Sequence, residues 1–355
     1  MACNGSLWLV NNSGAIQYWK IKDSTWKELD YERIEFKRVS CTTKAAFAVG
    51  GDHQIYLYVP SRDVPIRVAV ETYENQRCYP IKGFSSTLLP TDRSNFSSAD
   101  GTVALPKESF KLPSRHWAWE SEWYTADNIE GEPLEPECWT YAIDFPMEYG
   151  AANQWKSLVR RRKWIRYRRY VAFNSWVLLE SVGEDHVSEP FIDVTCGGYD
   201  IPGNTSKSLC VWAVTVLSRV FVREAVTPTS PEGDVWLHIT TPEEKVNQLS
   251  VGPTGLVWAV TWEGNALVRV GVTRDSLFGI DWVEVDAPEE TKLLQVSVGI
   301  DAVWAITRDY RVWFRKGVRG QSSGFNDNCA TGSGWIEMVG EMSMLTLSPT
   351  DQVRF

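Results

Sequence analysis

The sequence lacks any apolar run approaching the roughly 18–20 residues that a membrane-spanning helix needs. Its first residues, MACNGSLWLVNNSG, have neither a basic flank nor a long apolar core, so we expect no secretory signal. Its seven cysteines are scattered and contain no CxxC pair, which argues against a zinc site or a disulfide framework. A reducing compartment, the cytosol, is therefore the expected location.

Patterns typical of catalysis and of nucleic-acid binding are also scarce. The four histidines show no HExxH-type spacing, and no phosphate-binding P-loop is found. We therefore expect a protein that is not an enzyme and that holds neither a cofactor nor a metal. Asp and Glu outnumber Lys and Arg by 45 to 36, and no nucleic-acid-binding motif is recognisable, so we expect no nucleic acid as a partner.

Tryptophan, by contrast, is abundant, with 18 residues, and its spacing reveals a repeat. The segments VWAVTVLSRVFVRE, VWAVTWEGNALVRV and VWAITRDYRVWFRK align, and Trp212, Trp258 and Trp304 recur at intervals of 46 residues. A short strand-like run precedes each segment (DVTCGG, QLSVGP and QVSVGI). Short strands separated by turns at this period predict four-stranded propeller blades. An arginine recurs in each copy, and we expect it to stack on a blade tryptophan.

Two weaker copies of the repeat lie near the N-terminus. One lacks an initial strand, and the other supplies three strands up to residue 59, with its fourth delayed until Trp176. Residues 60–173 therefore interrupt the second copy. The predicted division is a propeller of residues 1–59 and 174–355 with an inserted domain of residues 60–173.

The C-terminal region offers a way to complete the ring. Residues 342–348 resemble an initial strand, and pairing beside residues 7–10 would let the two chain ends share one blade. We expect five blades closed in this way, because closure removes exposed sheet edges. The alternative is part of a propeller from a longer chain, because the ending TDQVRF resembles the start of another strand.

The insert contains the run RRRKWIRYRR (160–169), with seven cations in ten residues. In a strand, alternate side chains share a face, as would the tryptophans of HWAWESEW (116–123). Two such strands could interleave guanidinium planes with indole faces, at about 0.5–2 kcal/mol for each stack. The predicted structural cation–π ladder consists of Trp117, Trp119, Trp123, Trp139, Arg162, Trp164, Arg166 and Arg168. Anionic-lipid contacts by the cations on the opposite face and a nucleic-acid patch are the alternatives.

The loop PMEYGAANQWKSLV (146–159) precedes the arginine run and carries Trp155. An indole left on a loop tip suits the headgroup level of a membrane. Met147, Tyr149 and Lys156 lie close to it in sequence and complete the candidate lipid-binding set. A tryptophan that folds back over the core is the alternative.

These motifs resemble two known families. The VSVG, VWAV and following Arg and Trp positions resemble the tectonin repeat, and HWAWESEW, CWTYAIDF and RRRKWIRYRR together resemble a dysferlin (DysF) domain. The resemblance implies an all-β chain: a five-bladed tectonin-type β-propeller closed by its two termini, with an all-β DysF domain in the second blade.

The resemblance also implies a function. It indicates a reader of sphingomyelin exposed on the cytosolic face of damaged lysosomes, with autophagy proteins as possible partners, and it matches Trp155 to a membrane-inserting tryptophan. A protein-interaction scaffold that uses the propeller surface, in autophagosome–lysosome or peroxisome biology, is a second hypothesis. A tectonin-type lectin is a third, against which the expected cytosolic location argues.

Overall fold

The computed structural model of the chain describes residues 6–20, 25–29, 34–179, 189–242, 245–320, 328–348 and 350–354. The chain divides into two compact units, residues 1–61 with 173–355, and residues 62–172. The predicted insert, 60–173, begins two residues before the second unit and ends one residue after it.

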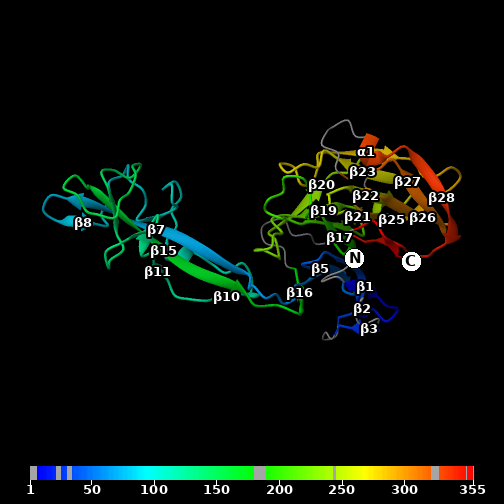
Figure 1. Cartoon of the computed structure of the whole chain (residues 1–355), viewed down its shortest axis with the longest axis horizontal. Coiled ribbons are helices and arrows are strands. Elements are labelled where there is room, and N and C mark those ends of the chain that lie inside the picture. Colours follow the sequence, from blue (N-terminus) through cyan, green and yellow to red (C-terminus); the bar gives the residue numbers. More distant parts are fainter. Residues whose placement is uncertain are drawn as a thin grey trace. The chain divides into compact units, whose positions relative to one another are not determined.

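Over its described residues, the first unit forms five blades of a β-propeller, which confirms the predicted fold class (Figure 1). The first blade has three strands and each of the others has four. The first two blades consist of β1 (Ser6–Val10), β2 (Ile16–Lys20) and β3 (Thr25–Glu28), and of β4 (Phe36–Cys41), β5 (Ala46–Gly50), β6 (Ile55–Tyr58) and β16 (Trp176–Leu178). The other three consist of β17 (Phe191–Gly197), β18 (Cys210–Thr215), β19 (Val220–Arg223) and β20 (Trp236–Ile239); β21 (Val246–Val251), β22 (Val257–Thr261), β23 (Ala266–Val270) and β24 (Asp281–Val285); and β25 (Leu293–Val298), β26 (Val303–Thr307), β27 (Arg311–Lys316) and β28 (Gly334–Glu341), with helix α1 (Asn328–Thr331) before β28.

The interruption of the second blade is visible in its strand pairing. Strand β16 pairs with β6, with Trp176 opposite Tyr58, although more than a hundred residues separate them. The predicted delay of the fourth strand is thus confirmed.

The repeated arginines stack inside the blades, as expected. Arg223, Arg269 and Arg315 each lie opposite the tryptophan that opens the next strand, with the guanidinium carbon 5.5, 5.2 and 5.1 Å from the ring centroid. Each Nε also donates to a backbone carbonyl. Burial lowers the pKa of Arg223 to about 10. Each of these arginines therefore connects the third and fourth strands of its own blade.

Neighbouring blades are joined by a repeated hydrogen bond between their inner strands. In four successive pairs of inner strands, a hydroxyl on one strand accepts a backbone N–H of the next. The pairs are Ser40 with Cys196, Thr195 with Val251, Ser250 with Val298 and Ser297 with Leu347, at 3.1, 3.2, 3.0 and 3.0 Å. This explains the Ser or Thr at the third position of the repeated inner-strand motif.

The C-terminal strand differs from the prediction. Strand β29 (Thr346–Leu347) takes the place after β25 in this series, and it pairs with β30 (Val353–Arg354) rather than with residues 7–10. A tight turn holds this hairpin, because the backbone N–H of Ser348 donates to Gln352 O. The predicted sharing of one sheet by the two chain ends is therefore wrong for these strands, although residues from both line the central channel.

The close approach of inner strands leaves no room for a side chain at Gly252. A Cβ on Gly252 would lie 2.2 Å from the carbonyl oxygen of Gly299 in the next blade. This oxygen belongs to the backbone, so it cannot move aside as the end of a flexible side chain could. Gly252→Ala is therefore expected to lower the free energy of unfolding by about 1–3 kcal/mol, measured by chemical denaturation.

The matched control is Gly334→Ala. Its Cβ would meet no atom within 4 Å, so a change within about 0.5 kcal/mol is expected. Equal losses in the two variants would contradict the role of the inter-blade contact.

Asp193 lines the central channel, a cavity of about 350 Å³, where the next two repeats carry Gln248 and Gln295. Its Oδ2 accepts the Leu249 N–H at 2.8 Å, and Arg38 lies 4.0 Å away. Burial raises the pKa of Asp193 to about 6, against the lowering effect of Arg38. A raised pKa in the folded state means that folding favours the protonated acid.

The stability contributed by protonated Asp193 is therefore complete below about pH 4 and is lost as the pH rises to about 6. Asp193→Asn should remove this loss, so that its stability relative to the unaltered chain rises by about 1–3 kcal/mol between pH 4 and pH 7. Denaturant unfolding at several pH values measures the difference. A constant difference across that range would contradict the assignment.

The second unit is a β-sheet built around one long strand. It contains β7 (Arg67–Tyr79), β8 (Gly83–Ser85), β9 (Phe96–Ser97), the 3₁₀ turn η2 (Lys107–Ser109), β10 (Trp117–Trp119), β11 (Tyr124–Thr125), β12 (Asn128–Ile129), β13 (Glu132–Pro133), β14 (Thr140–Ala142) and β15 (Val159–Tyr170). Strand β15 pairs with β7 from Val159–Arg77 to Arg169–Arg67. The short strands β10, β11 and β14 pair with β15 in turn along its other edge. The arginine run is thus the central strand of this unit.

Candidate functional site

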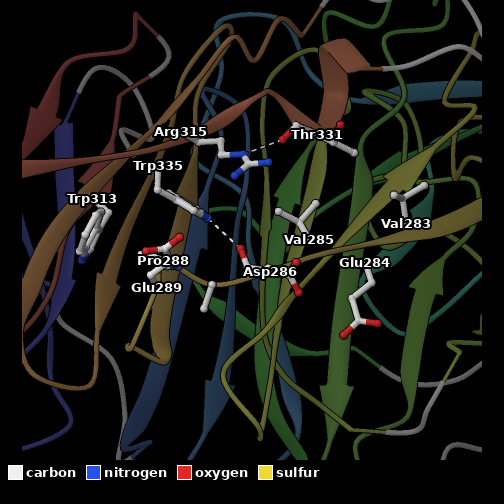
Figure 2. Close-up of a pocket in the computed structure, with 11 residues that line it drawn as sticks. Val283, Glu284, Val285, Asp286, Pro288, Glu289, Trp313, Arg315, Thr331 and Trp335 are labelled. Carbon is white, nitrogen blue, oxygen red and sulfur yellow. Dashed lines mark hydrogen bonds between the residues drawn. The ribbon is translucent and has the colours of Figure 1, made fainter.

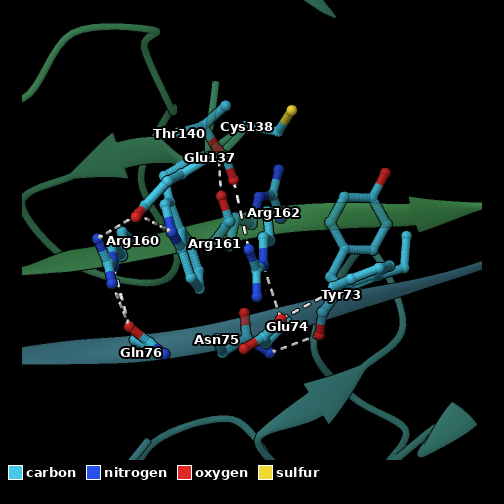
Figure 3. Close-up of polar contacts among 12 residues, drawn as sticks. Tyr73, Glu74, Asn75, Gln76, Glu137, Cys138, Thr140, Arg160, Arg161 and Arg162 are labelled. Carbon is cyan, nitrogen blue, oxygen red and sulfur yellow. Dashed lines mark hydrogen bonds and ion pairs between the residues drawn. The ribbon is translucent and has the colours of Figure 1, made fainter. Parts of the chain in front are cut away.

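One face of β15 interleaves cations with indoles. Arg160 and Arg162 both stack on Trp139, with guanidinium carbons 4.0 and 4.4 Å from its ring centroid. The Arg162 Nε and the Trp164 Nε1 donate to the same Glu74 carboxylate oxygen, at 2.7 and 2.8 Å. Figure 3 shows Arg162 reaching from β15 to Glu74 on β7. This part of the sheet is held by stacking and by charge-assisted hydrogen bonds.

The same face continues toward β10. Arg166 lies 4.2 Å from the Trp119 ring, and Arg168 lies 5.2 Å from the Trp117 ring. Burial lowers the pKa of Arg168. Trp123 lies elsewhere, because β10 ends at Trp119 and the Trp123 ring packs edge-on against Phe110. The structure therefore places Trp123 apart from the other indoles of the predicted ladder.

The opposite face of β15 engages two of its three cations, Arg161 and Lys163, whereas Arg169 is exposed. Arg161 lies 3.9 Å from the ring of Tyr149 and 4.8 Å from that of Tyr73. Lys163 forms an ion pair with Glu71 at 2.7 Å. These two cations are therefore committed to contacts within the unit, which weakens the alternative that they serve as a lipid-binding face.

Strand β7 supplies acceptors that the sequence argument did not single out. Besides Glu74, the Gln76 amide oxygen accepts two hydrogen bonds from Arg160, at 2.9 and 2.7 Å. The acidic residues of RVAVETYENQRCY (67–79) were the available signal, because a cation-rich strand needs acceptors on its neighbour.

Hydrogen bonds fix the start of the loop that carries Trp155 to the sheet. Arg77 makes two hydrogen bonds to Asp92, at 2.7 and 2.6 Å, and one to Asp144 at 3.1 Å. The hydrogen bond from Arg77 lowers the pKa of Asp92. Phe145 beside this network is buried. Tyr149 is half-buried and turned toward Arg161, so it supports the loop rather than forming its exposed tip.

The tip of the loop is a tight turn that projects Trp155. The Ser157 N–H donates to Gln154 O at 2.9 Å, and the Gln154 N–H donates to the Ser157 hydroxyl at 3.0 Å. Trp155 and Lys156 are the two central residues of this turn. The Trp155 side chain is 96% exposed, and Lys156 and Met147 are exposed as well. The alternative in which Trp155 covers the core is therefore excluded for this conformation.

The propeller has a separate cavity of about 600 Å³ (Figure 2). Trp313 and Trp335 form aromatic walls, and Glu284, Asp286 and Glu289 add carboxylates. The Trp335 indole N–H donates to the backbone oxygen of Asp286 at 2.9 Å. The two aligned repeats before it carry Phe221 and Leu267 at the position of Trp313. The cavity lies between the fourth and fifth blades, because its lining runs from Val283 to Glu289 and includes Trp313 and Trp335.

Among the described residues, no group of three or more His, Cys, Asp or Glu side chains is placed to hold a metal ion. No described helix has the length and apolar character that crossing a membrane requires.

Two sequence families match parts of the chain. The family described as "Propeller" matches residues 211–239, 256–285 and 302–338, which lie in the last three blades. The family described as "Integral peroxisomal membrane peroxin" matches residues 19–166, from the first blade through most of the insert.

Curated relatives are similar over more of the chain. The tectonin β-propeller repeat-containing protein of Drosophila melanogaster is 47% identical over 98% of this chain and 26% of its own. Tectonin β-propeller repeat-containing protein 1 of Mus musculus is 47% identical over 98% of this chain and 29% of its own, and that of Homo sapiens is 43% identical over 71% and 22%. The chain thus spans about a quarter of the length of these relatives, none of which is named as an enzyme. The chain belongs to the tectonin β-propeller repeat-containing protein family.

Proposed function

We propose that this chain is a membrane-lipid recognition module whose insert contacts the bilayer through Trp155. Its target would be sphingomyelin exposed on the cytosolic face of damaged lysosomes, and its binding would recruit autophagy-type membrane repair or conjugation. The observation that carries the proposal is the 96% exposure of the Trp155 side chain on a hydrogen-bonded turn.

Leaving the Trp155 indole in water costs free energy, because its large apolar area stays hydrated. An indole offers a large apolar area with one polar N–H, and it is favoured where lipid headgroups meet acyl chains. The turn is fixed to a sheet held by the Arg77 clamp and the Trp139 stack. Little loop order has to be gained on binding, so more of the interaction energy appears as affinity.

The choice of sphingomyelin, the cytosolic location and the autophagy partners rest on the resemblance of the insert to DysF domains. The match of residues 19–166 to a family described as a membrane peroxin agrees with a membrane role, although that description belongs to the matched family.

Flotation with vesicles of phosphatidylcholine, with and without sphingomyelin, tests the proposal. The full chain is expected to float with sphingomyelin-containing vesicles and to remain behind with pure phosphatidylcholine. Equal flotation with both would reject the lipid selectivity, and absence of flotation with either would reject the membrane function.

A protein-interaction scaffold is the second candidate, favoured by the cavity between the fourth and fifth blades, which has Trp313 and Trp335 on its walls. Partner capture by the full chain separates the two functions. A partner that is lost with Trp313→Ala and retained with Trp155→Ala would support the scaffold.

A further inference from the structure

The turn between β7 and β8 carries a second exposed apolar side chain. Gly83 pairs with Tyr79, so Pro80, Ile81 and Lys82 form the end of this hairpin. The Ile81 side chain is fully exposed, at 102%, and its two neighbours are exposed as well. An apolar residue as exposed as this has no packing role in the unit.

Strand register brings this turn to the end of the unit that holds the Trp155 turn. Strands β7 and β15 are antiparallel, with Arg77 opposite Val159, so the end of β7 lies beside the start of β15. The Cys78 N–H donates to Leu158 O at 2.8 Å, three residues from Trp155 and three from Ile81. Both segments therefore leave the sheet at one end, where Figure 1 shows β8.

Strand β8, which follows the Ile81 turn, contacts both β14 and β15, which precede and follow the Trp155 loop. The ring of Phe84 on β8 lies 5.7 Å from that of Tyr141 on β14, and Arg160 stacks on Phe84 at 4.7 Å. The two turns are thus braced by one aromatic cluster rather than carried on independent loops.

The chemistry of the two turns is the same. Each presents one fully exposed apolar side chain followed by an exposed lysine: Ile81 with Lys82, and Trp155 with Lys156. A protein partner would need a contiguous, closely packed core of contact residues, which two separate tips do not offer. Isolated apolar tips with adjacent lysines suit a bilayer, since the apolar groups can enter the acyl boundary while the ammonium groups stay at headgroup level.

We propose that the β7–β8 turn is a second bilayer contact, in which Ile81 enters the membrane beside Trp155. This inference rests on the proposed membrane function and extends it from one anchoring residue to two. Two contacts on one braced end raise affinity beyond that of a single tip and fix the orientation of the unit on the membrane.

Vesicle partition of the full chain, with sphingomyelin and phosphatidylcholine, tests the inference. Ile81→Ala is expected to lower the partition coefficient about fivefold, and Ile81→Trp to raise it above that of the unaltered chain. Val64 provides the matched control, because it is 76% exposed and precedes the opposite end of β7. Val64→Ala and Val64→Trp should leave partition unchanged.

The higher partition coefficient expected for Ile81→Trp distinguishes a lost membrane contact from misfolding, because a damaged sheet would not bind more tightly. Unchanged partition of both Ile81 variants, together with a loss in Trp155→Ala, would overturn this inference and leave the proposed function standing. Absence of binding by the unaltered chain would overturn both.

Discussion

Trp155→Ala is expected to lower vesicle partition about thirtyfold, equivalent to about 2 kcal/mol, without changing the stability of the chain. The loss follows from removing an indole that is 96% exposed on the Gln154–Ser157 turn. Stability should hold because this side chain covers no core residue. Flotation at several vesicle concentrations gives the partition coefficient, and thermal unfolding checks the fold.

Two controls define what the loss means. Trp155→Phe keeps an apolar ring and should recover part of the binding, whereas Trp262→Ala removes another exposed indole, in the propeller, and should have no effect. Full binding by Trp155→Ala would reject this residue as the membrane contact. A similar loss in Trp262→Ala would indicate non-specific adsorption through exposed aromatic rings.

Trp139→Ala is expected to destabilise the insert by about 3–5 kcal/mol, the usual cost of emptying a buried aromatic site. The Trp139 ring is buried between Arg160 and Arg162, and its indole N–H donates to Glu137 at 3.1 Å. Its removal takes the nearer of two aromatic rings from each guanidinium group, and leaves Arg160 with Phe84 and Arg162 with Trp164. Hydrogen–deuterium exchange of the full chain should show faster exchange in β7 and β15 and little change in the propeller strands.

Trp123→Ala is the matched control for this prediction. Trp123 is half-buried and packs on Phe110, and no described cation stacks on it. Its loss should cost less than half as much as that of Trp139. Equal acceleration of exchange in the two variants would show that the arginine stacks add nothing beyond ordinary burial.

Much of the propeller could be predicted because its information is local and repeated. Each copy carries the same inner-strand motif, a tryptophan at the same position and an arginine at the same position, so three aligned copies indicate one blade design. The pairing of the C-terminal strand could not be predicted, because residues 342–348 suit an inner strand whether it pairs with residues 7–10 or with β30. The choice depends on the hydroxyl of Ser297 and on the hydrogen bond from the Ser348 N–H to Gln352 O, which are contacts rather than properties of the strand itself.

In the insert, alternation along β15 indicated which cations share a face, but not their partners. Trp139 comes from a different segment from Trp117 and Trp119, and it takes two arginines. The acceptors Glu74 and Gln76 lie more than eighty residues before the arginines that they bind. Pairing over such a distance is set by strand register, which the spacing within one segment does not reveal.

The sequence by itself determined the blade repeat, the place of the insert and the presence of an arginine–tryptophan strand, because these depend on period and on local residue type. Only the tertiary structure decided that Trp155 faces solvent while Tyr149 turns inward. It also decided that Ile81, more than seventy residues earlier, shares an end of the sheet with Trp155. Exposure and proximity depend on which segments pack together: the Gln154–Ser157 turn leaves Trp155 in solvent, and the antiparallel register of β7 and β15 brings Ile81 to the same end.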